Sequence, residues 1–283
     1  MSRNRYTWTE DKIARYYKEG RGTGELNNYL PWLTIHDVPS KGRSHRPKGW
    51  KTKRKHQILS DLELTYFYYL EWSNKVIDIR EQFPLDREDT LKIAAEKNIP
   101  HPFESSTQTP IVMTTDFLVT SRLGNEIFLF ARSIKPSEEL EDSRVMEKLE
   151  IERQYWEDKG VEWAVINEKV MSKQFFKNLK YIHEYYDLVS SDEEEMSLHF
   201  LDFLTSQLLK HPEKKLINCC NDFDSLYNLD DGSSIYYIRH LYARQHIVPA
   251  DIDNKAIQPH KISLNELSII KGGTDNIYGS FIS

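Results

Sequence analysis

The spacing of apolar and polar residues in the first half of the chain predicts helices and strands in mixed order. It indicates a helix over 60–72, a strand over 76–80, a short helix over 90–97, strands over 112–120 and 127–134, a long helix over 138–159 and a strand over 161–167. Gly124-Asn125, between the two longer strands, is typical of a hairpin turn. The order predicts a mixed α/β sheet flanked by helices, which is the core order of restriction-endonuclease-like folds.

Helix-start and helix-stop signals fix some of these boundaries. Thr7-x-x-Glu10 reads as a capping box for a helix that ends at Gly20, and Ser60-x-x-Glu63 reads as another. Ser137 is expected to cap the long helix, with the acidic residues after it in the first turn, and Gly160 to end it.

The second half of the chain predicts a mainly helical domain. Helical patterns cover 174–186, 196–210, 216–227 and 233–246, and 247–257 is expected to form a hairpin that turns at Asp253-Asn254. The acidic run 192–195 is most simply a solvated linker. Helix, turn, helix and hairpin form the outline of a winged helix. We therefore predict a first, mixed α/β domain over 1–168, a second, helical and winged-helix-like domain over 169–270 and a mobile tail over 271–283.

Composition limits the setting. Of the 283 residues, 39% are hydrophobic and 29% are charged, and no apolar run approaches the ~20 residues that a membrane helix needs. The start of the chain lacks the apolar core of a signal peptide. Cys219 and Cys220 are adjacent, so a disulfide within the chain is not expected. These features favour a reducing cytoplasm, without a membrane contact.

Charge is distributed unevenly. The net charge is −6, but residues 1–57 hold 14 Lys and Arg against 5 Asp and Glu, which leaves −15 for residues 58–283. Eight cations without an acid lie between 41 and 55: Lys41, Arg43, Arg46, Lys48, Lys51, Lys53, Arg54 and Lys55. This basic segment is either a solvated loop or an arm that binds DNA phosphates, with Trp50 and nearby histidines available to stack.

Three residues carry candidate chemistry. Asp116 lies inside an apolar β-branched run, where a carboxylate costs stability unless it is paired or bound to a metal. Lys135 ends the next strand on the same face as Ser133, so it can point toward Asp116. Glu63 has two readings, since its capping box could account for it without any catalytic role.

A carboxylate further along the chain has a weaker claim. Glu152 follows Lys148 by four residues on the long predicted helix, which favours a surface ion pair. Its alternative role is that of a supporting carboxylate behind the three candidate residues.

The chain resembles the TnsA family, the endonuclease subunits of heteromeric bacterial transposases. The segments that carry the resemblance include Pro31-Trp32-Leu33-Thr34, Gly42-Arg43-Ser44-His45-Arg46, Leu59-Ser60-Asp61-Leu62-Glu63-Leu64, Asp78-Ile79-Arg80-Glu81-Gln82-Phe83-Pro84-Leu85, Thr115-Asp116-Phe117-Leu118-Val119, Lys135-Pro136 and Tyr155-Trp156. The resemblance implies that Glu63, Asp116 and Lys135 match the family's catalytic residues. It also implies a restriction-type first domain and a winged-helix-type second domain.

The resemblance also implies the partners. Family members cut the 5′ ends of a transposon, while an RNase H-like transposase subunit cuts and joins the 3′ ends. An AAA+ ATPase regulator contacts the C-terminal part. The expected substrate is the double-stranded DNA of the transposon ends.

Two carboxylates suit Mg²⁺, which prefers oxygen ligands. We expect Glu63, Asp116 and the backbone carbonyl of Ile134 to hold one or two Mg²⁺ ions, with Mn²⁺ as an alternative ion. In one respect the chain departs from such nucleases. Two residues before the lysine they commonly carry Glu or Gln, whereas this chain has Ser133, a poorer metal ligand.

The leading hypothesis is a Mg²⁺-dependent endonuclease that cuts one DNA strand at each transposon end. The first alternative is a free-standing repair or restriction nuclease that cuts DNA unaided. The second is an adaptor that tethers DNA and whose nuclease fold is catalytically weak or inactive.

Overall fold

The computed structural model describes residues 6–38 and 42–270 of the chain. The chain divides into two compact units, Met1–Val170 and Met171–Ser283. The tail predicted to be mobile, 271–283, lies outside the described residues. Within the described ranges, no helix is long and apolar enough to cross a membrane.

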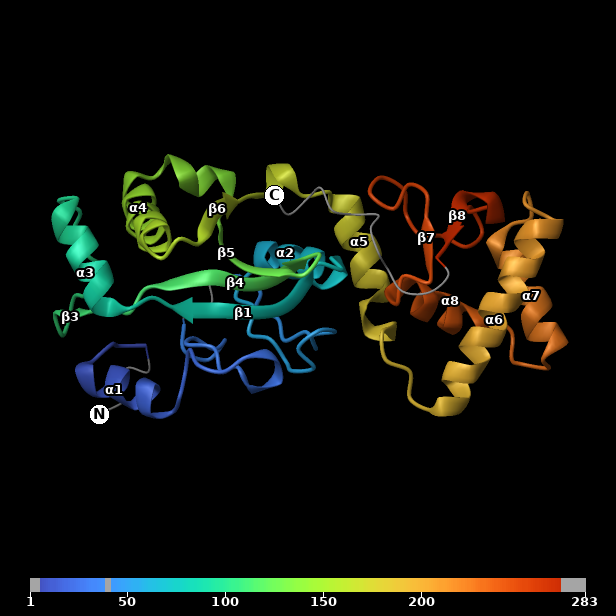
Figure 1. Ribbon diagram of the computed structural model, residues 1–283, viewed down its shortest axis with the longest axis horizontal. Helices are drawn as coiled ribbons and strands as arrows, with labels where there is room; N and C mark the ends of the chain where they lie inside the picture. Colours follow the sequence, from blue (N-terminus) through green and yellow to red (C-terminus); the bar gives the residue numbers. More distant parts are fainter. Residues whose placement is uncertain (1–5, 39–41, 271–283) are drawn as a thin grey trace. The chain divides into compact units, whose positions relative to one another are not determined.

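The first unit is built on a four-stranded sheet in the order β1-β4-β5-β6 (Figure 1). These strands are β1 (Val76–Pro84), β4 (Thr114–Leu123), β5 (Glu126–Ile134) and β6 (Glu162–Ile166). β1 pairs with β4 and β4 with β5 in antiparallel fashion, whereas β5 and β6 are parallel. Gly124 adopts φ +60° between β4 and β5, which confirms the predicted hairpin turn.

Helices cover the sheet, as the order of elements predicts. On one face Leu118 and Ala131 pack against Ile151 and Trp156 of α4 (Ser143–Asp158) and against α3 (Arg87–Glu96). α2 (Asp61–Trp72) contacts β1 and β5, and the ring of its Tyr66 lies against Phe117 of β4. The predicted mixed α/β sheet flanked by helices is therefore present.

Short elements complete the first unit, and two predicted helix starts are wrong. These elements are α1 (Glu10–Lys18), η1 (Leu26–Asn28), β2 (Phe103–Glu104), β3 (Thr109–Pro110), η2 (Ser137–Glu141) and η3 (Glu168–Val170). α1 is capped by Thr9, not by Thr7. The predicted long helix is broken at Asp142, whose extended backbone lets its carboxylate cap α4, so the acidic residues before it form the separate turn η2.

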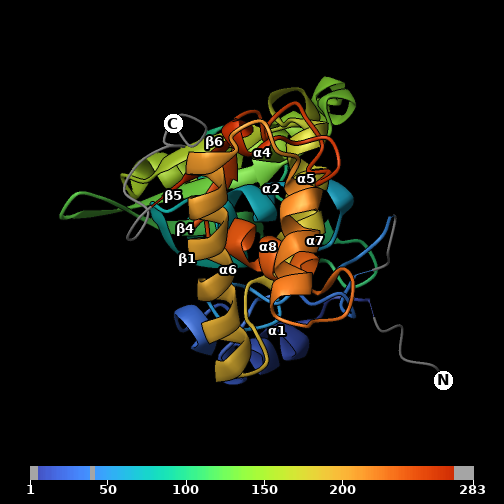
Figure 2. The same ribbon diagram turned by 90° about the vertical axis from the view of Figure 1, so that its right-hand side faces the viewer.

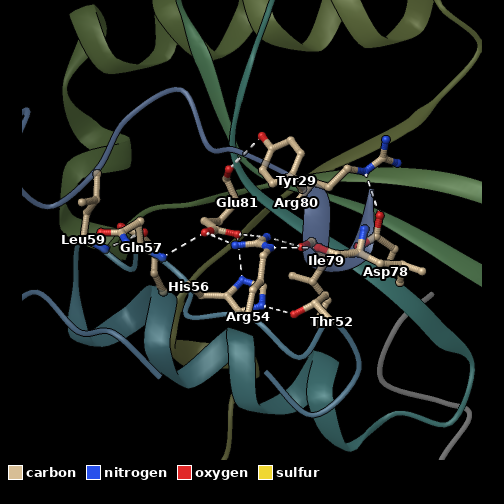
Figure 3. Close-up of polar contacts among 12 residues, drawn as sticks. Tyr29, Thr52, Arg54, His56, Gln57, Leu59, Asp78, Ile79, Arg80 and Glu81 are labelled. Atoms are coloured by element: carbon tan, nitrogen blue, oxygen red, sulfur yellow. Dashed lines mark hydrogen bonds and ion pairs between the residues drawn. The ribbon is translucent and has the colours of Figure 1, made fainter. Parts of the chain in front are cut away.

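β1 is longer than predicted because its polar residues are buried and paired. Glu81 is fully buried, and its two oxygens accept hydrogen bonds from the guanidinium of Arg54 at 2.7 and 2.5 Å. The ring Nδ1 of His56 lies 2.7 Å from the same carboxylate (Figure 3). Burial opposes the ionisation of Glu81, but His56 and Arg54 more than offset it and hold its pKa well below the usual range.

The second unit is mainly helical, as predicted. It contains α5 (Lys173–Ile182), η4 (His183–Tyr185), α6 (Ser191–Lys210), α7 (Leu216–Leu226), α8 (Ser233–Ala243), β7 (Ile247–Pro249), η5 (Leu264–Glu266) and β8 (Leu267–Ile269). α6, α7 and α8 contact one another (Figure 2) around a core that includes Phe200 and Phe223.

Two predictions for this unit are wrong. The acidic run 192–195 is not a linker but the start of α6, where Ser190 caps the helix and negative charge suits the helix dipole. The hairpin predicted over 247–257 is absent from the described residues, because β7 pairs instead with the distant β8. Turns and bends fill much of the stretch between them.

We predict that Glu81→Gln destabilises the protein by about 3 to 5 kcal/mol at pH 7, because Arg54 would remain buried without its ionic partner. Urea unfolding measures the change. The contribution of Glu81 is complete above pH 4.5, the pKa of an ordinary glutamate, and is lost progressively below it. The difference in the free energy of unfolding between wild type and Glu81→Gln should therefore become smaller in acid.

The matched control is Arg43→Ala. Its side chain is 81% exposed and pairs with Asp61, so its loss should cost less than about 1 kcal/mol. Equal losses for the two variants would contradict the structural role assigned to the Arg54–Glu81 pair.

Candidate active site

Asp116 lies where β4 meets the end of β5. Its Oδ2 accepts the backbone N–H of Ile134 at 2.7 Å and the ammonium of Lys135 at 2.9 Å. The same ammonium donates to the carbonyl oxygen of Ile134 at 3.0 Å. Strand alternation thus predicts the direction of Lys135 correctly: the side chain turns toward Asp116 rather than into solvent.

Glu63 lies in the first turn of α2 and is only 7% exposed. The Ser60 hydroxyl accepts the backbone N–H of Glu63, and the Glu63 carboxylate accepts the N–H of Leu59 and the Ser60 hydroxyl. The capping role is therefore real. Burial, and after it the negative charge of Asp116, raise the pKa of Glu63 to about 7. The carboxylate that anchors the helix start is therefore also coupled electrostatically to Asp116.

The lysine is held as a cation. Burial would lower the pKa of Lys135, but the carboxylate of Asp116 outweighs it, and Glu152 and Glu63 add to the effect. The net result is a raised pKa. A positive charge thus faces these carboxylates at neutral pH.

Glu152 belongs to the site's surroundings, and its prediction as a surface ion pair is wrong. The side chain is buried on α4, and its Oε1 accepts from Thr115 Oγ1 at 2.7 Å and from Trp163 Nε1 at 3.1 Å. The Ser133 hydroxyl donates to the same oxygen. Burial and the charge of Asp116 raise the pKa of Glu152. Its alternative role as a supporting carboxylate fits this placement.

The oxygen atoms around Asp116 are compatible with a small, hard cation. In the described part of the chain, no three His, Cys, Asp or Glu side chains gather as a complete metal site. A mixed donor set is available instead: the carboxylates of Asp116 and Glu63 and the carbonyl oxygen of Ile134. The ammonium of Lys135 already contacts Oδ2 of Asp116 and the carbonyl oxygen of Ile134. These two oxygens therefore face the same point, and a positive charge can reach it.

Comparison with known proteins identifies the family. The family model "TnsA-like endonuclease N terminal" matches residues 73–168, and "TnsA endonuclease C terminal" matches residues 171–249. The chain is 40% identical over 246 residues to the Transposon Tn7 transposition protein TnsA of Escherichia coli, covering 86% of this chain and 87% of the relative. The chain belongs to the TnsA family. In this TnsA-family chain, Asp116 and Lys135 lie inside the first matched region and Glu63 lies just before it.

The basic segment of this TnsA-family protein is folded rather than extended. Bridges join His45 to Ile58 and Lys48 to Lys55, so the segment doubles back on itself. Among the predicted DNA-binding residues, Lys41 lies outside the described residues, and those exposed to solvent are Arg43, Arg46, Lys48, Lys53 and Lys55.

Two predicted DNA contacts, Arg54 and Lys51, are partly buried. Arg54 is committed to Glu81 and to the carbonyl of Ile79, and its side chain is 9% exposed. Burial lowers the pKa of Lys51 to about 8, although Glu71 opposes the shift. Trp50, expected to stack on bases, is buried as well. Sequence position alone could not separate the cations that fold inward from those that face solvent.

The hydrogen bonds of Glu152 lead to a prediction about stability. Glu152→Leu should cost more than about 2 kcal/mol, because the buried hydroxyls of Thr115 and Ser133 and the partly buried indole N–H of Trp163 would lose their acceptor. Glu152→Gln keeps an oxygen in place and should stay within about 1 kcal/mol of wild type. Urea unfolding of both variants, with Glu157→Leu on the exposed side of α4 as control, decides the matter. A similar loss in the glutamine variant would show that the charge itself is needed.

Proposed function

We propose that this TnsA-family chain is the endonuclease subunit of a Tn7-type transposase and that it hydrolyses one DNA strand at each 5′ end of its transposon. The observation that carries the proposal is the contact of Lys135 with Asp116 at 2.9 Å, at a place where the charges of both act on the buried carboxyl of Glu63. Acids from a helix start and a strand, with a lysine from the neighbouring strand, form the arrangement of a restriction-type nuclease.

The proposal includes one or two divalent ions, Mg²⁺ with Mn²⁺ as an alternative. Glu63, Asp116 and the carbonyl of Ile134 would hold them. When bound, such an ion lowers the pKa of water and neutralises charge on the phosphate. The chain's own residues then have distinct tasks. Lys135 brings a permanent positive charge to the phosphate, and Asp116 holds that ammonium in place.

The serine at position 133 bears on whether the chain is an active nuclease. It replaces a residue type that commonly binds metal in such nucleases, which favours the alternative of an inactive adaptor. In this structure, however, the Ser133 hydroxyl supports Glu152, whose charge acts on both Asp116 and Lys135. Glu152 on α4 thus adds the negative charge that Ser133 on β5 does not supply. This supports an active enzyme.

The fold supports the same assignment. We propose a restriction-endonuclease-like arrangement for the first unit, and the mixed sheet with α2 and α4 against it supports this proposal. For the second unit we propose a winged-helix type, with α7 and α8 followed by the β7–β8 pair in the place of the wing. It would bind an AAA+ ATPase regulator.

The remaining partners follow from the reaction. The substrate would be the double-stranded DNA of the transposon ends, in the bacterial cytoplasm, and an RNase H-like transposase subunit would cut and join the 3′ ends. The exposed cations of the basic segment would contact DNA phosphates. Two cuts of different strands by two subunits would release the element.

Loss of a site residue should remove 5′ cleavage and spare the partner's chemistry. In a reconstituted excision reaction scored strand by strand, Asp116→Ala, Lys135→Ala and Glu63→Ala should each lower the 5′ cut by at least about 100-fold. Joining of the 3′ ends should continue. Products should carry a 5′-phosphate and a 3′-hydroxyl.

The alternatives give different results in the same assay. An adaptor would leave 5′ processing unchanged in all three variants. A free-standing nuclease would nick DNA in the absence of the partner transposase. Glu157→Ala on the exposed side of α4 serves as the control and should cut at the wild-type rate.

The basic segment should bind DNA through phosphates rather than bases. Replacing Arg43, Arg46 and Lys55 together with alanine should weaken DNA binding at every sequence tested. The slope of log K against log salt should become shallower by about 0.9 for each phosphate that the variant no longer neutralises. Fluorescence anisotropy over a salt series measures both. A triple variant of Lys18, Lys92 and Lys148, all exposed cations elsewhere in the first unit, should bind like wild type.

A further inference from the structure

Gln82, near the end of β1, has a backbone conformation that is rare for a residue with a side chain. Its φ is +49°, in the left-handed region, which costs about 1 kcal/mol or more for any residue but glycine. The register is the same on both sides, with Glu81 opposite Phe117 and Phe83 opposite Thr115. The left-handed conformation therefore does not come from a residue inserted into β1. The unchanged register places Gln82 opposite Asp116.

The surroundings of Gln82 maintain this conformation. Its carbonyl oxygen accepts the N–H of Trp32 at 3.2 Å, and Trp32 is itself fully buried. The side chain of Gln82 is 2% exposed, and its Oε1 accepts the hydroxyl of Thr114 at 3.3 Å. Backbone and side chain are thus fixed independently, one by the core of the first unit and the other by β4.

The amide nitrogen of Gln82 points at the site. Nε2 donates to Oδ1 of Asp116 at 3.4 Å. Chemistry fixes this orientation of the amide, because a carboxylate accepts hydrogen bonds and the nitrogen end is the donor. Oδ2 of Asp116 is meanwhile held by Ile134 and Lys135 at 2.7 and 2.9 Å. The two oxygens of Asp116 therefore differ in their hydrogen bonds. Oδ2 accepts two short ones, whereas Oδ1 accepts a long one from Gln82.

We propose that Gln82 is a positioning residue for Asp116. The left-handed backbone turns the amide into the site, where it fixes the rotation of the Asp116 carboxylate and presents Oδ1 to the divalent ion. The long contact guides this oxygen without occupying it, so the oxygen stays available as a ligand. The inference deepens the proposed function and rests on it.

The chemistry of the position explains why a glutamine suits it. A glutamate would place a further negative charge beside Asp116 and would lack the donor. Asparagine accepts a left-handed backbone more readily, but its amide is one methylene shorter and would not reach Oδ1. Glycine removes the backbone cost and the amide together. These three substitutions separate the conformation of the strand from the contact to Asp116.

The test compares Gln82→Gly with Gln108→Gly. Gln108 is also left-handed, at φ +57°, but it is exposed in the turn between β2 and β3, where its amide binds the carbonyl of Ser105 at 2.7 Å. We expect Gln82→Gly to lower kcat for 5′ strand cleavage at least tenfold, with KM for DNA unchanged. The Mg²⁺ concentration for half-maximal rate should rise at least tenfold.

A second readout does not depend on catalysis. Divalent ions that bind the folded protein raise its melting temperature. With Mn²⁺ as the probe, the concentration that gives half of the maximal rise should be at least tenfold higher for Gln82→Gly than for wild type. Gln108→Gly should match wild type in both measurements. Gln82→Asn and Gln82→Glu should behave like Gln82→Gly, and Gln82→Asn replaces it if the glycine variant does not fold.

The outcomes are distinct. A Gln82 variant that is folded and has wild-type kcat and Mn²⁺ response would overturn the positioning role and leave the left-handed backbone as a matter of packing. A loss that appears only in KM would also overturn it, since the amide would then act on DNA binding. A wild-type protein that neither cuts in the complete reaction nor responds to Mn²⁺ would instead refute the proposed function.

Discussion

The hydrogen bonds of the Asp116 carboxylate are the constraint on which the site depends. A buried carboxylate is tolerated only where donors surround it, and here a backbone N–H, an ammonium and an amide do so. Burial raises the pKa of Glu63 and Glu152, and the charge of Asp116 raises both further. Burial would lower the pKa of Lys135, but Asp116 raises it. One side chain on β4 thus acts on three groups that come from α2, β5 and α4. The sheet and its helices bring these segments together.

The central residues could be predicted because their signals are local. Alternation along β5 fixes the face of Lys135, and an acid inside an apolar strand is costly enough to mark Asp116. Glu152 could not be found in the same way. Its spacing from Lys148 indicates a surface pair, whereas the side of α4 that meets the sheet decides its burial. Gln82 gives no signal at all, since no local pattern predicts a left-handed residue within a strand.

The fold shows the same division. A helix start with a good cap, such as Ser60, can be predicted correctly, and so can the hairpin at Gly124. The far end of β1 escapes prediction because Glu81 reads as a solvent residue until Arg54, distant in sequence, is placed against it. The pairing of β7 escapes it because its true partner, β8, follows after a long irregular stretch. Counting cations locates the basic segment but cannot tell that Arg54 pairs with the buried Glu81.

The end of β5 is hydrogen-bonded both to the Asp116 carboxylate and to β6. The N–H of Ile134 donates to Asp116, and the N–H of Lys135 donates to the carbonyl of Ile166 on β6, at 3.0 Å. Two consecutive peptide groups therefore connect the acid to the strand that leads out of the first unit. Opening of the bond between the Ile134 N–H and Asp116 would expose that N–H to exchange with solvent. Hydrogen exchange at this one amide therefore reports on the hydrogen bonding of the Asp116 carboxylate.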